Sequence, residues 1–329
     1  MRAPASSSGE LRPVSFRGPV AALAGGVGGA KLAVGLALAL PEGALSVIVN
    51  TADDLTLHGL HISPDLDTVM YNLAGLADPQ AGWGIAGDTA GALGLLGRYG
   101  GPTWFRLGDK DLATHIRRTQ RLAEGARLTE ATAELCRALG VRARVLPMTD
   151  SPVATRVQTP EGELEFQDYF VARGTRPWVL GVRFQGAEEA RPSPEAARAL
   201  EEARAIVFCP SNPIVSVGPI LAVAGIRERI LAARVPRIAV SPIVGGVALK
   251  GPAAEMLRSL GHEVSAAGVA AILREHLDGF VLDERDAALL PQVEGLGLKA
   301  KALPTVMTDG ASKQRLAEGV LAFAAELAR

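Results

Sequence analysis

Residues 19–50 read PVAALAGGVGGAKLAVGLALALPEGALSVIVN, and this stretch decides the fold class. It divides into four expected elements, a strand at 20–23, a glycine loop at 25–29, a helix at 31–40 and a second strand at 45–49. A strand, a helix and a strand within roughly thirty residues form a βαβ unit, whose two strands lie parallel in one sheet. Lys31 and the glycines interrupt the apolar run, so we interpret it as neither a membrane span nor a signal peptide.

The composition indicates an ordered protein without a charge bias. The chain has 329 residues, of which 48% are hydrophobic and 21% charged, so it can bury a large core. With 34 Lys and Arg against 35 Asp and Glu, the net charge is -1, and we expect neither nucleic acid nor a membrane as partner. Two cysteines, Cys136 and Cys209, argue against a disulfide framework or a cysteine-rich metal site, and this usage is typical of the cytoplasm.

The rest of the chain predicts an α/β fold with a helical insertion. Residues 1–17 are rich in Ser, Pro and Arg, which predicts a disordered tail before a single α/β domain at 18–329. Helical patterns without obvious strands occupy about 64–140 and indicate an insertion on one side of the sheet. Alternating strands and helices follow, so we predict a Rossmann-like three-layer sandwich with a mainly parallel sheet.

The glycines between the first strand and the first helix favour an anion site. They would let backbone N–H groups approach a phosphate, and the following helix adds the positive end of its dipole. Their spacing matches neither the Walker pattern nor the usual dinucleotide fingerprint. A tight strand-to-helix turn is the structural alternative, but the position within a βαβ unit favours phosphate binding.

Carboxylates follow the second strand and begin the next helix. Asp53 and Asp54 come directly after the strand at 45–49, at the carboxyl edge where ligands of open α/β sheets bind. They could coordinate Mg²⁺ or hold hydroxyl groups, whereas capping explains one aspartate more readily than two. In the next helix we interpret Asp65 as a cap at the helix start and Asp67 as functional, since it returns acid to the same crevice.

An aromatic segment and two later loops complete the predicted site. Trp104 and Phe105 could stack on a flat heterocycle, with Arg106 pairing with it or with phosphate, although core packing is the alternative for the aromatic rings. Loops at 210–219 and 241–246 follow apolar strands and suit a nucleotide base or diphosphate, unless they are simply rigid turns. Oxygen ligands, backbone amides and a stacking surface together indicate phosphoryl-group transfer.

These motifs together resemble the 2-phospho-L-lactate transferase family, of CofD/FbiA type, in coenzyme F420 biosynthesis. The matching stretches, from about residue 23 to 252, are AGGVGGAKL, VNTADD, GLHISPDLDTVMY, GWGI, WFRLGDKDLATHIRRT, LPMTD, FQDYFV, PSNPIVSVGPIL, SPIVGG and LKGPA. The resemblance implies a Mg²⁺-dependent transferase that moves a phosphoenolpyruvyl or 2-phospholactyl group from a guanosine diphosphate-linked donor to the ribityl hydroxyl of the deazaflavin Fo. GMP would leave, and the enzyme would be a cytoplasmic homodimer.

The resemblance also implies roles for individual residues. The nucleotide side would comprise Gly25, Gly26, Gly28, Gly29, Lys31, Ser211, Asn212 and Gly246. Fo would be bound by Asp67, Arg106 and Trp104. The catalytic or metal-binding carboxylates would be Asp53, Asp54 and Asp67. The glycine turn has the form of bacterial members, which favours a phosphoenolpyruvate-derived donor over the 2-phospholactate one, with a 3-phosphoglycerate-derived donor as a further alternative.

Two other functions serve as alternatives. A non-catalytic nucleotide-binding regulator of the related gluconeogenesis-factor type would share the glycine turn but should lack the WFRLGD and DLDT elements, which this chain has. An NAD-dependent oxidoreductase would need the dinucleotide fingerprint. The acidic pair Asp53 and Asp54 also stands too near the glycines for that function.

Overall fold

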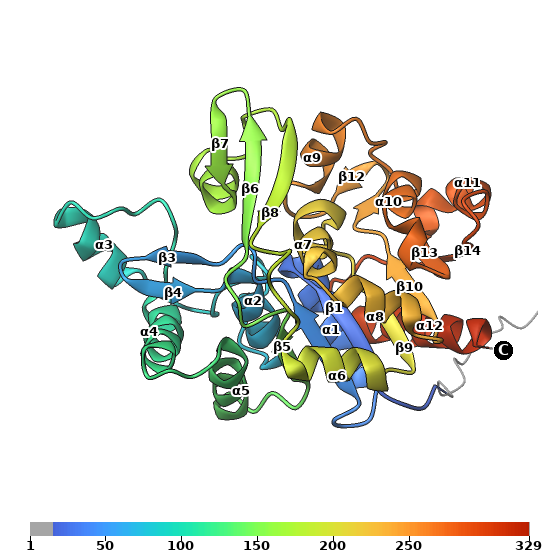
Figure 1. The fold of residues 1–329 in the computed structure, drawn as a ribbon, viewed down its shortest axis with the longest axis horizontal. Coiled ribbons are helices and arrows are strands. Elements are labelled where there is room, and N and C mark those ends of the chain that lie inside the picture. The colour runs from blue at the N-terminus through green and yellow to red at the C-terminus, as the bar shows by residue number, and fades with distance from the viewer. Residues whose placement is uncertain (1–15, 329) are drawn as a thin grey trace, which may run out of the picture.

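The computed structural model describes residues 16–328, so most of the predicted tail at 1–17 lies outside the described residues. A seven-stranded sheet runs through the molecule in the order β14-β13-β10-β9-β1-β2-β5, and all neighbouring strands are parallel (Figure 1). The strands are β1 (Val20–Ala24), β2 (Leu45–Val49), β5 (Arg144–Pro147), β9 (Ala205–Phe208), β10 (Arg237–Val240), β13 (Gly279–Asp283) and β14 (Lys299–Leu303). The predicted parallel α/β fold is therefore confirmed.

Helices cover both faces of this sheet. One face carries α1 (Gly26–Ala39), α2 (Pro64–Leu73), α5 (Leu128–Ala138) and α12 (Gly310–Leu327). The other carries α6 (Pro194–Glu202), α7 (Gly218–Ala222), α8 (Ile226–Ala232), α9 (Ala253–Ser259), α10 (Ala266–Leu273) and α11 (Leu290–Glu294). Successive residues of a strand face opposite layers, so Leu23 packs in one core and Ala22 in the other. This arrangement is the predicted three-layer sandwich.

Smaller elements surround the sheet. The hairpin of β3 (Leu55–Leu57) and β4 (Leu60–Ile62), with α3 (Gly91–Arg98) and α4 (Asp109–Ala123), extends from one end of the molecule in Figure 1. A separate antiparallel sheet is formed by β6 (Ala154–Thr159), β7 (Gly162–Glu165) and β8 (Gly181–Gln185). A third pair consists of β11 (Ile243–Val244) and β12 (Val247–Ala248). Short π-helical and 3₁₀ turns lie at Asp168–Ala172, Pro213–Val217, Arg274–His276 and Glu284–Leu289.

The first helix begins earlier than the sequence predicts. The expected glycine loop at 25–29 is mostly the first turn of α1, which starts at Gly26. Gly26 has a φ of +63°, a left-handed conformation that glycine adopts at little cost, and this lets the chain enter the helix directly after β1. The backbone N–H groups of this turn are therefore held in a helix and not in a flexible loop.

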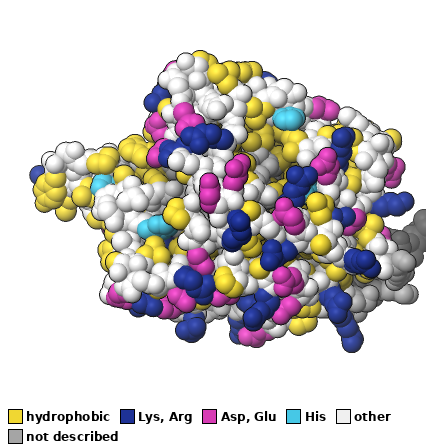
Figure 2. All heavy atoms as spheres, in the orientation of Figure 1, with side chains coloured by type: hydrophobic (Ala, Val, Ile, Leu, Met, Phe, Trp, Pro, Cys, Tyr) yellow, Lys and Arg dark blue, Asp and Glu magenta, His cyan; other side chains and the backbone are white. Residues whose placement is uncertain are grey.

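Acidic and basic side chains are interspersed over the face of the molecule seen in Figure 2, in keeping with the balanced net charge. No part of this face carries one sign of charge alone over a wide area. Within residues 16–328, no helix is both long enough and apolar enough to cross a membrane.

Helices α1 and α12 pack unusually closely because α1 has a glycine at their contact. A Cβ atom placed on Gly35 would overlap the backbone carbonyl oxygen of Lys313, which begins the second turn of α12. A backbone oxygen cannot move aside as a side chain can, so the whole helix would have to shift. Gly35 therefore sets the distance between two helices of the same layer.

We predict that Gly35→Ala lowers the free energy of unfolding by about 1–3 kcal/mol, because the added methyl group separates α1 from α12. Gly94→Ala is the matched control, since Gly94 lies in α3 with open space around it. That control should stabilise the helix by roughly 0.5–1 kcal/mol. Urea unfolding followed by circular dichroism measures both, and equal effects of the two changes would contradict the close packing at Gly35.

Candidate functional site

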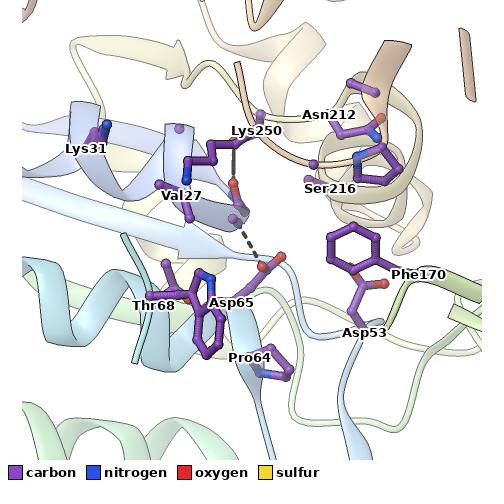
Figure 3. Close-up of a pocket in the computed structure, with 18 of the residues that line it drawn as sticks. Val27, Lys31, Asp53, Pro64, Asp65, Thr68, Phe170, Asn212, Ser216 and Lys250 are labelled. Carbon is purple, nitrogen blue, oxygen red and sulfur yellow. Dashed lines mark hydrogen bonds between the residues drawn. The ribbon is translucent and has the colours of Figure 1, made fainter. Parts of the chain in front are cut away.

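A cavity of about 970 Å³ opens at the carboxyl ends of the parallel strands. The strand order reverses between β1 and β9, and segments after both of these strands line the cavity. Loops at such a reversal diverge to opposite sides of the sheet, which leaves a crevice for ligands. Residues that follow β2, β10 and β14, a segment of the 64–140 region and residues within 166–171 complete the walls, and Figure 3 shows Asp53, Asp65 and Phe170 among them.

The glycines of α1 allow the β9 loop to lie against the helix start. A Cβ atom on Gly28 would overlap the carbonyl oxygen of Pro210, and one on Gly29 would come within 2.6 Å of the Ser211 hydroxyl. Ser211 in turn donates to the carbonyl oxygen of Gly25 at 2.8 Å and accepts from its N–H at 3.1 Å. Gly25, Gly26, Gly28 and Ser211 line the cavity, whereas the buried Gly29 does not.

Three other residues predicted for the nucleotide side take different positions. Lys31 lines the cavity and donates to the Met307 carbonyl oxygen at 3.0 Å, while burial and the charges of neighbouring lysines lower its pKa. The Asn212 side chain also lines the cavity, and its Oδ1 accepts from the Ile214 N–H at 2.9 Å. Gly246 lies in the turn between β11 and β12 and does not line the cavity.

Two carboxylates of the cavity wall, Asp53 and Asp65, are joined by one side-chain amide. The Nδ2 atom of Asn50 donates to Asp53 at 2.9 Å and to Asp65 at 3.0 Å, so a single amide joins the loop after β2 to the first turn of α2. Asp65 also accepts from the Gly26 N–H at 2.8 Å. In Figure 3 Asp53 and Asp65 approach the cavity from different segments. Asp65 thus caps the start of α1 and not, as predicted, its own helix α2, whose N-cap residue is Ser63.

Burial and mutual repulsion change the acidity of this carboxylate pair. Burial, followed by the nearby charge of Asp65, raises the pKa of Asp53 well above its usual range. Burial raises the pKa of Asp65 to about 6, although hydrogen bonds from Asn50 and Gly26 oppose the rise. Both groups therefore gain from a positively charged ligand that would compensate their repulsion.

The pair fits a hard divalent cation such as Mg²⁺. The Oδ1 atoms of Asp53 and Asp54 are both buried without a hydrogen-bond partner among the described residues, but of the two only Asp53 lines the cavity. Carboxylate oxygens that face a shared cavity are the ligands that Mg²⁺ prefers. The neighbouring Asp54 does not line the cavity, because its Oδ2 is bound by Ser63 at 2.7 Å and by His61 at 3.0 Å. The structure therefore pairs Asp53 with Asp65, and not with the predicted partner Asp54.

Asp67 lies in a buried ion pair. Both of its carboxylate oxygens are bound by the Arg118 guanidinium, one of them at 3.0 Å, and the Arg118 side chain is completely buried. Asp67, Asp111 and His115 could bring their ligand atoms within 4.8 Å of one another. A second cation there would be repelled by Arg118, so a metal fits this group poorly. The contacts of Asp67 therefore favour a role as the ion-pair partner of Arg118 over a role as a metal ligand.

The segment predicted for the heterocycle forms one arm of the cavity. The ring centroids of Trp104 and Phe105 are 5.7 Å apart in an edge-to-face arrangement, and Arg106 lines the cavity beside them. Trp104 is 39% exposed, so its face is available for stacking and the core-packing alternative does not apply to it. Trp83, which the sequence analysis did not select, also lines the cavity and is exposed.

Sequence reasoning missed several residues of the site. Asp65 was assigned to capping, yet its place two residues before Asp67 in the same motif was the available signal. Phe166 and Phe170 stack at 5.6 Å on the wall near Asp53, and they belong to the FQDYFV motif, which had no assigned role. Nothing in the sequence indicates that Arg118 is buried, because a buried arginine and an exposed arginine in a polar helix look the same in sequence.

The fold and the cavity define a class of protein: a doubly wound α/β protein with a cavity at the strand-order reversal, beside a carboxylate pair. The family model of 2-phospho-L-lactate transferase CofD matches residues 20–319. A 2-phospho-L-lactate transferase from Methanosarcina mazei is 43% identical over 297 residues, which cover 90% of this chain and 97% of that protein. A phosphoenolpyruvate transferase from Streptomyces griseus is 43% identical over 314 residues, 94% of this chain and 99% of that protein.

The chain belongs to the 2-phospho-L-lactate transferase CofD family and is a transferase, as the sequence predicts. Among solved structures, a protein of the UPF0052 family from Bacillus halodurans matches with a TM-score of 0.64. The two are 15% identical, and the match covers 93% of this chain and 99% of that one. This similarity supports the fold alone.

Replacement by asparagine should affect the stability of the protein differently at Asp65 and at Asp67, although the two residues are only two positions apart. Asp67→Asn leaves the Arg118 charge buried without its partner and should cost about 3–5 kcal/mol of stability. For Asp65→Asn, the melting temperature relative to wild type should rise between about pH 4 and pH 6 and then stay level, because burial raises the pKa of the wild-type carboxyl from 3.8 to about 6. Thermal melting across this pH range tests both, and parallel curves for Asp65→Asn and wild type would contradict the raised pKa.

Proposed function

We propose that this transferase moves a phosphoenolpyruvyl or 2-phospholactyl group from a guanosine diphosphate-linked donor to the ribityl hydroxyl of the deazaflavin Fo, with release of GMP, in coenzyme F420 biosynthesis. The observation that carries the proposal is the similarity along nearly the whole chain to proteins named for both of these transfers. The cavity supports it, since it has the size and the mixed lining that two ring-bearing substrates require.

The cavity offers different chemistry on its two sides. The start of α1, Ser211 and the cations Lys31 and Lys250 form a side suited to the diphosphate of the donor. Trp83, Trp104 and Arg106 form a side suited to the deazaflavin. The carboxylate pair lines the same cavity as both sides, so the acceptor hydroxyl and the donor phosphorus would meet beside Asp53 and Asp65.

The transfer forms one bond and breaks one bond at the same phosphorus. The ribityl oxygen attacks the phosphorus that carries the three-carbon acid, and the bond from that phosphorus to the oxygen of GMP breaks. The hydroxyl proton would pass to a carboxylate oxygen of Asp53 or Asp65 that the bound cation leaves free. Lys31 and the backbone N–H groups at the start of α1 orient the diphosphate and balance its charge.

Asp53 and Asp65 would hold Mg²⁺, which when bound supplies neutralisation of the phosphate charge. A dependence on Mg²⁺, a homodimer and a cytoplasmic location are parts of this proposal that follow from the family resemblance. The alternative of a non-catalytic nucleotide-binding regulator predicts nucleotide binding without turnover of Fo. The stacking segment around Trp104 favours the transferase over that regulator.

The purified protein should add mass to Fo when supplied with Mg²⁺ and either enolpyruvyl- or lactyl-diphosphoguanosine, with one GMP released per product. Mass spectrometry of both products measures this and identifies the acid that is transferred. Binding of Fo or GDP without any product from either donor would contradict the proposed transfer and favour the regulator.

Asp53→Asn should lower kcat by about 100-fold or more and should abolish the increase in melting temperature that Mg²⁺ gives the wild type. Asp54→Asn is the matched control, because Asp54 is adjacent in sequence but does not line the cavity. It should keep the response to Mg²⁺ and most of the activity. Loss of the Mg²⁺ response in the Asp54 variant alone would instead restore the predicted role of Asp54.

A further inference from the structure

A buried polar cluster closes the inner end of the cavity arm that carries Trp104. The Nε2 atom of His115 lies 3.1 Å from Oδ2 of Asp111, and the Tyr71 hydroxyl donates to Oδ1 of Asp111 at 2.6 Å. All three side chains line the cavity. Because α4 follows the segment of Trp104 directly, the cluster and the stacking surface belong to one continuous wall.

This cluster retains hydrogen-bonding capacity that the protein does not use. The His115 side chain is only 2% exposed, and its Nε2 makes no hydrogen bond of acceptable geometry with the described residues. Each carboxylate oxygen of Asp111 has one close protein neighbour and can accept a further bond. A buried ring nitrogen without a partner is costly unless a ligand satisfies it.

The cluster is also held in one arrangement. Arg118, in the next turn of α4, binds Asp67 of α2, and Oδ2 of Asp67 lies 3.6 Å from Nδ1 of His115. Burial would raise the pKa of Asp111, but the close contact with His115 and the hydrogen bond from the Tyr71 hydroxyl keep it below its usual range. Asp111 is thus a fixed, ionised acceptor, with a histidine nitrogen beside it.

We propose that Asp111 and His115 bind the pyrimidinedione edge of the acceptor ring and thereby select the acceptor. At that edge a ring N–H stands beside carbonyl oxygens, so Asp111 would accept from the N–H and His115 Nε2 would donate to a carbonyl. The inference rests on the proposed function, because it takes Fo as the acceptor. A phenolate edge would instead bring a second negative charge to Asp111, which opposes that orientation.

The first experiment measures binding without turnover. Fo is titrated into wild type, Asp111→Asn, His115→Phe and Asp109→Asn, with its fluorescence as the signal. Asp109→Asn is the matched control, since it makes the same chemical change on α4 at a residue that caps α3 and does not line the cavity. The first two variants should weaken Fo binding by about tenfold or more, and the control should not. GDP affinity should stay within about twofold in all of them.

A second experiment uses wild-type protein alone and therefore does not depend on whether a variant folds. Wild type should bind the N3-methyl derivative of Fo at least about tenfold more weakly than Fo, because the methyl group removes the N–H that Asp111 accepts. In Asp111→Asn this preference should shrink, and kcat at saturating Fo should change little while KM for Fo rises.

Equal binding of Fo and its N3-methyl derivative by wild type would overturn the inference. So would an unchanged preference in a folded Asp111→Asn variant. Either result would leave the proposed transfer intact if the wild-type protein still converts Fo to product. Absence of that conversion, despite the expected discrimination between the two rings, would count against the proposed function and not against this binding site.

Discussion

A single side-chain amide holds the centre of this molecule together. Nδ2 of Asn50 bonds to Asp53, to Asp65 and, at 3.3 Å, to the Val215 carbonyl oxygen. These groups belong to the loop after β2, to α2 and to the turn after β9, so the amide joins segments from both halves of the sheet. Asp65 extends this connection to the start of α1 through Gly26. The shape of the ligand cavity therefore depends on one buried donor with three acceptors.

The buried carboxylates around that centre have their negative charge compensated in two different ways. Asp67 is neutralised by Arg118 inside the protein, and removal of either partner leaves a charge without compensation. Asp53 and Asp65 face each other across a shared amide and have no buried cation as a direct partner among the described residues. Charge compensation for them comes most favourably from a ligand, which is how an active site differs from a structural ion pair.

The sequence predicts the central strands of the sheet because they are continuous apolar runs between turn residues, whereas the edge strand β14, with its alternating lysines, was not predicted. Val20–Ala24 and Leu45–Val49 are fully buried, and such strands can be predicted from their own apolar residues without knowledge of the strands they pair with. The hairpin of β3 and β4 escaped prediction, since three-residue strands are too short to show alternation. At the site, the sequence indicates the carboxyl edge of the sheet but not which aspartates share it. That choice depends on side-chain direction, and Asp54 turns toward His61 while Asp65 turns toward Gly26.

Overall similarity does not decide which three-carbon acid the donor carries. The relatives named for 2-phospho-L-lactate and for phosphoenolpyruvate are equally similar to this chain, at 43% identity. The two acids differ only in the saturation of one carbon–carbon bond, a change that apolar contacts distinguish weakly. If the proposed transfer is correct, discrimination would arise from the few groups that touch this unit near Asp53 and Asp65. The fold and the carboxylate pair would then be common to both transfers, and the immediate neighbours of that pair would select the donor.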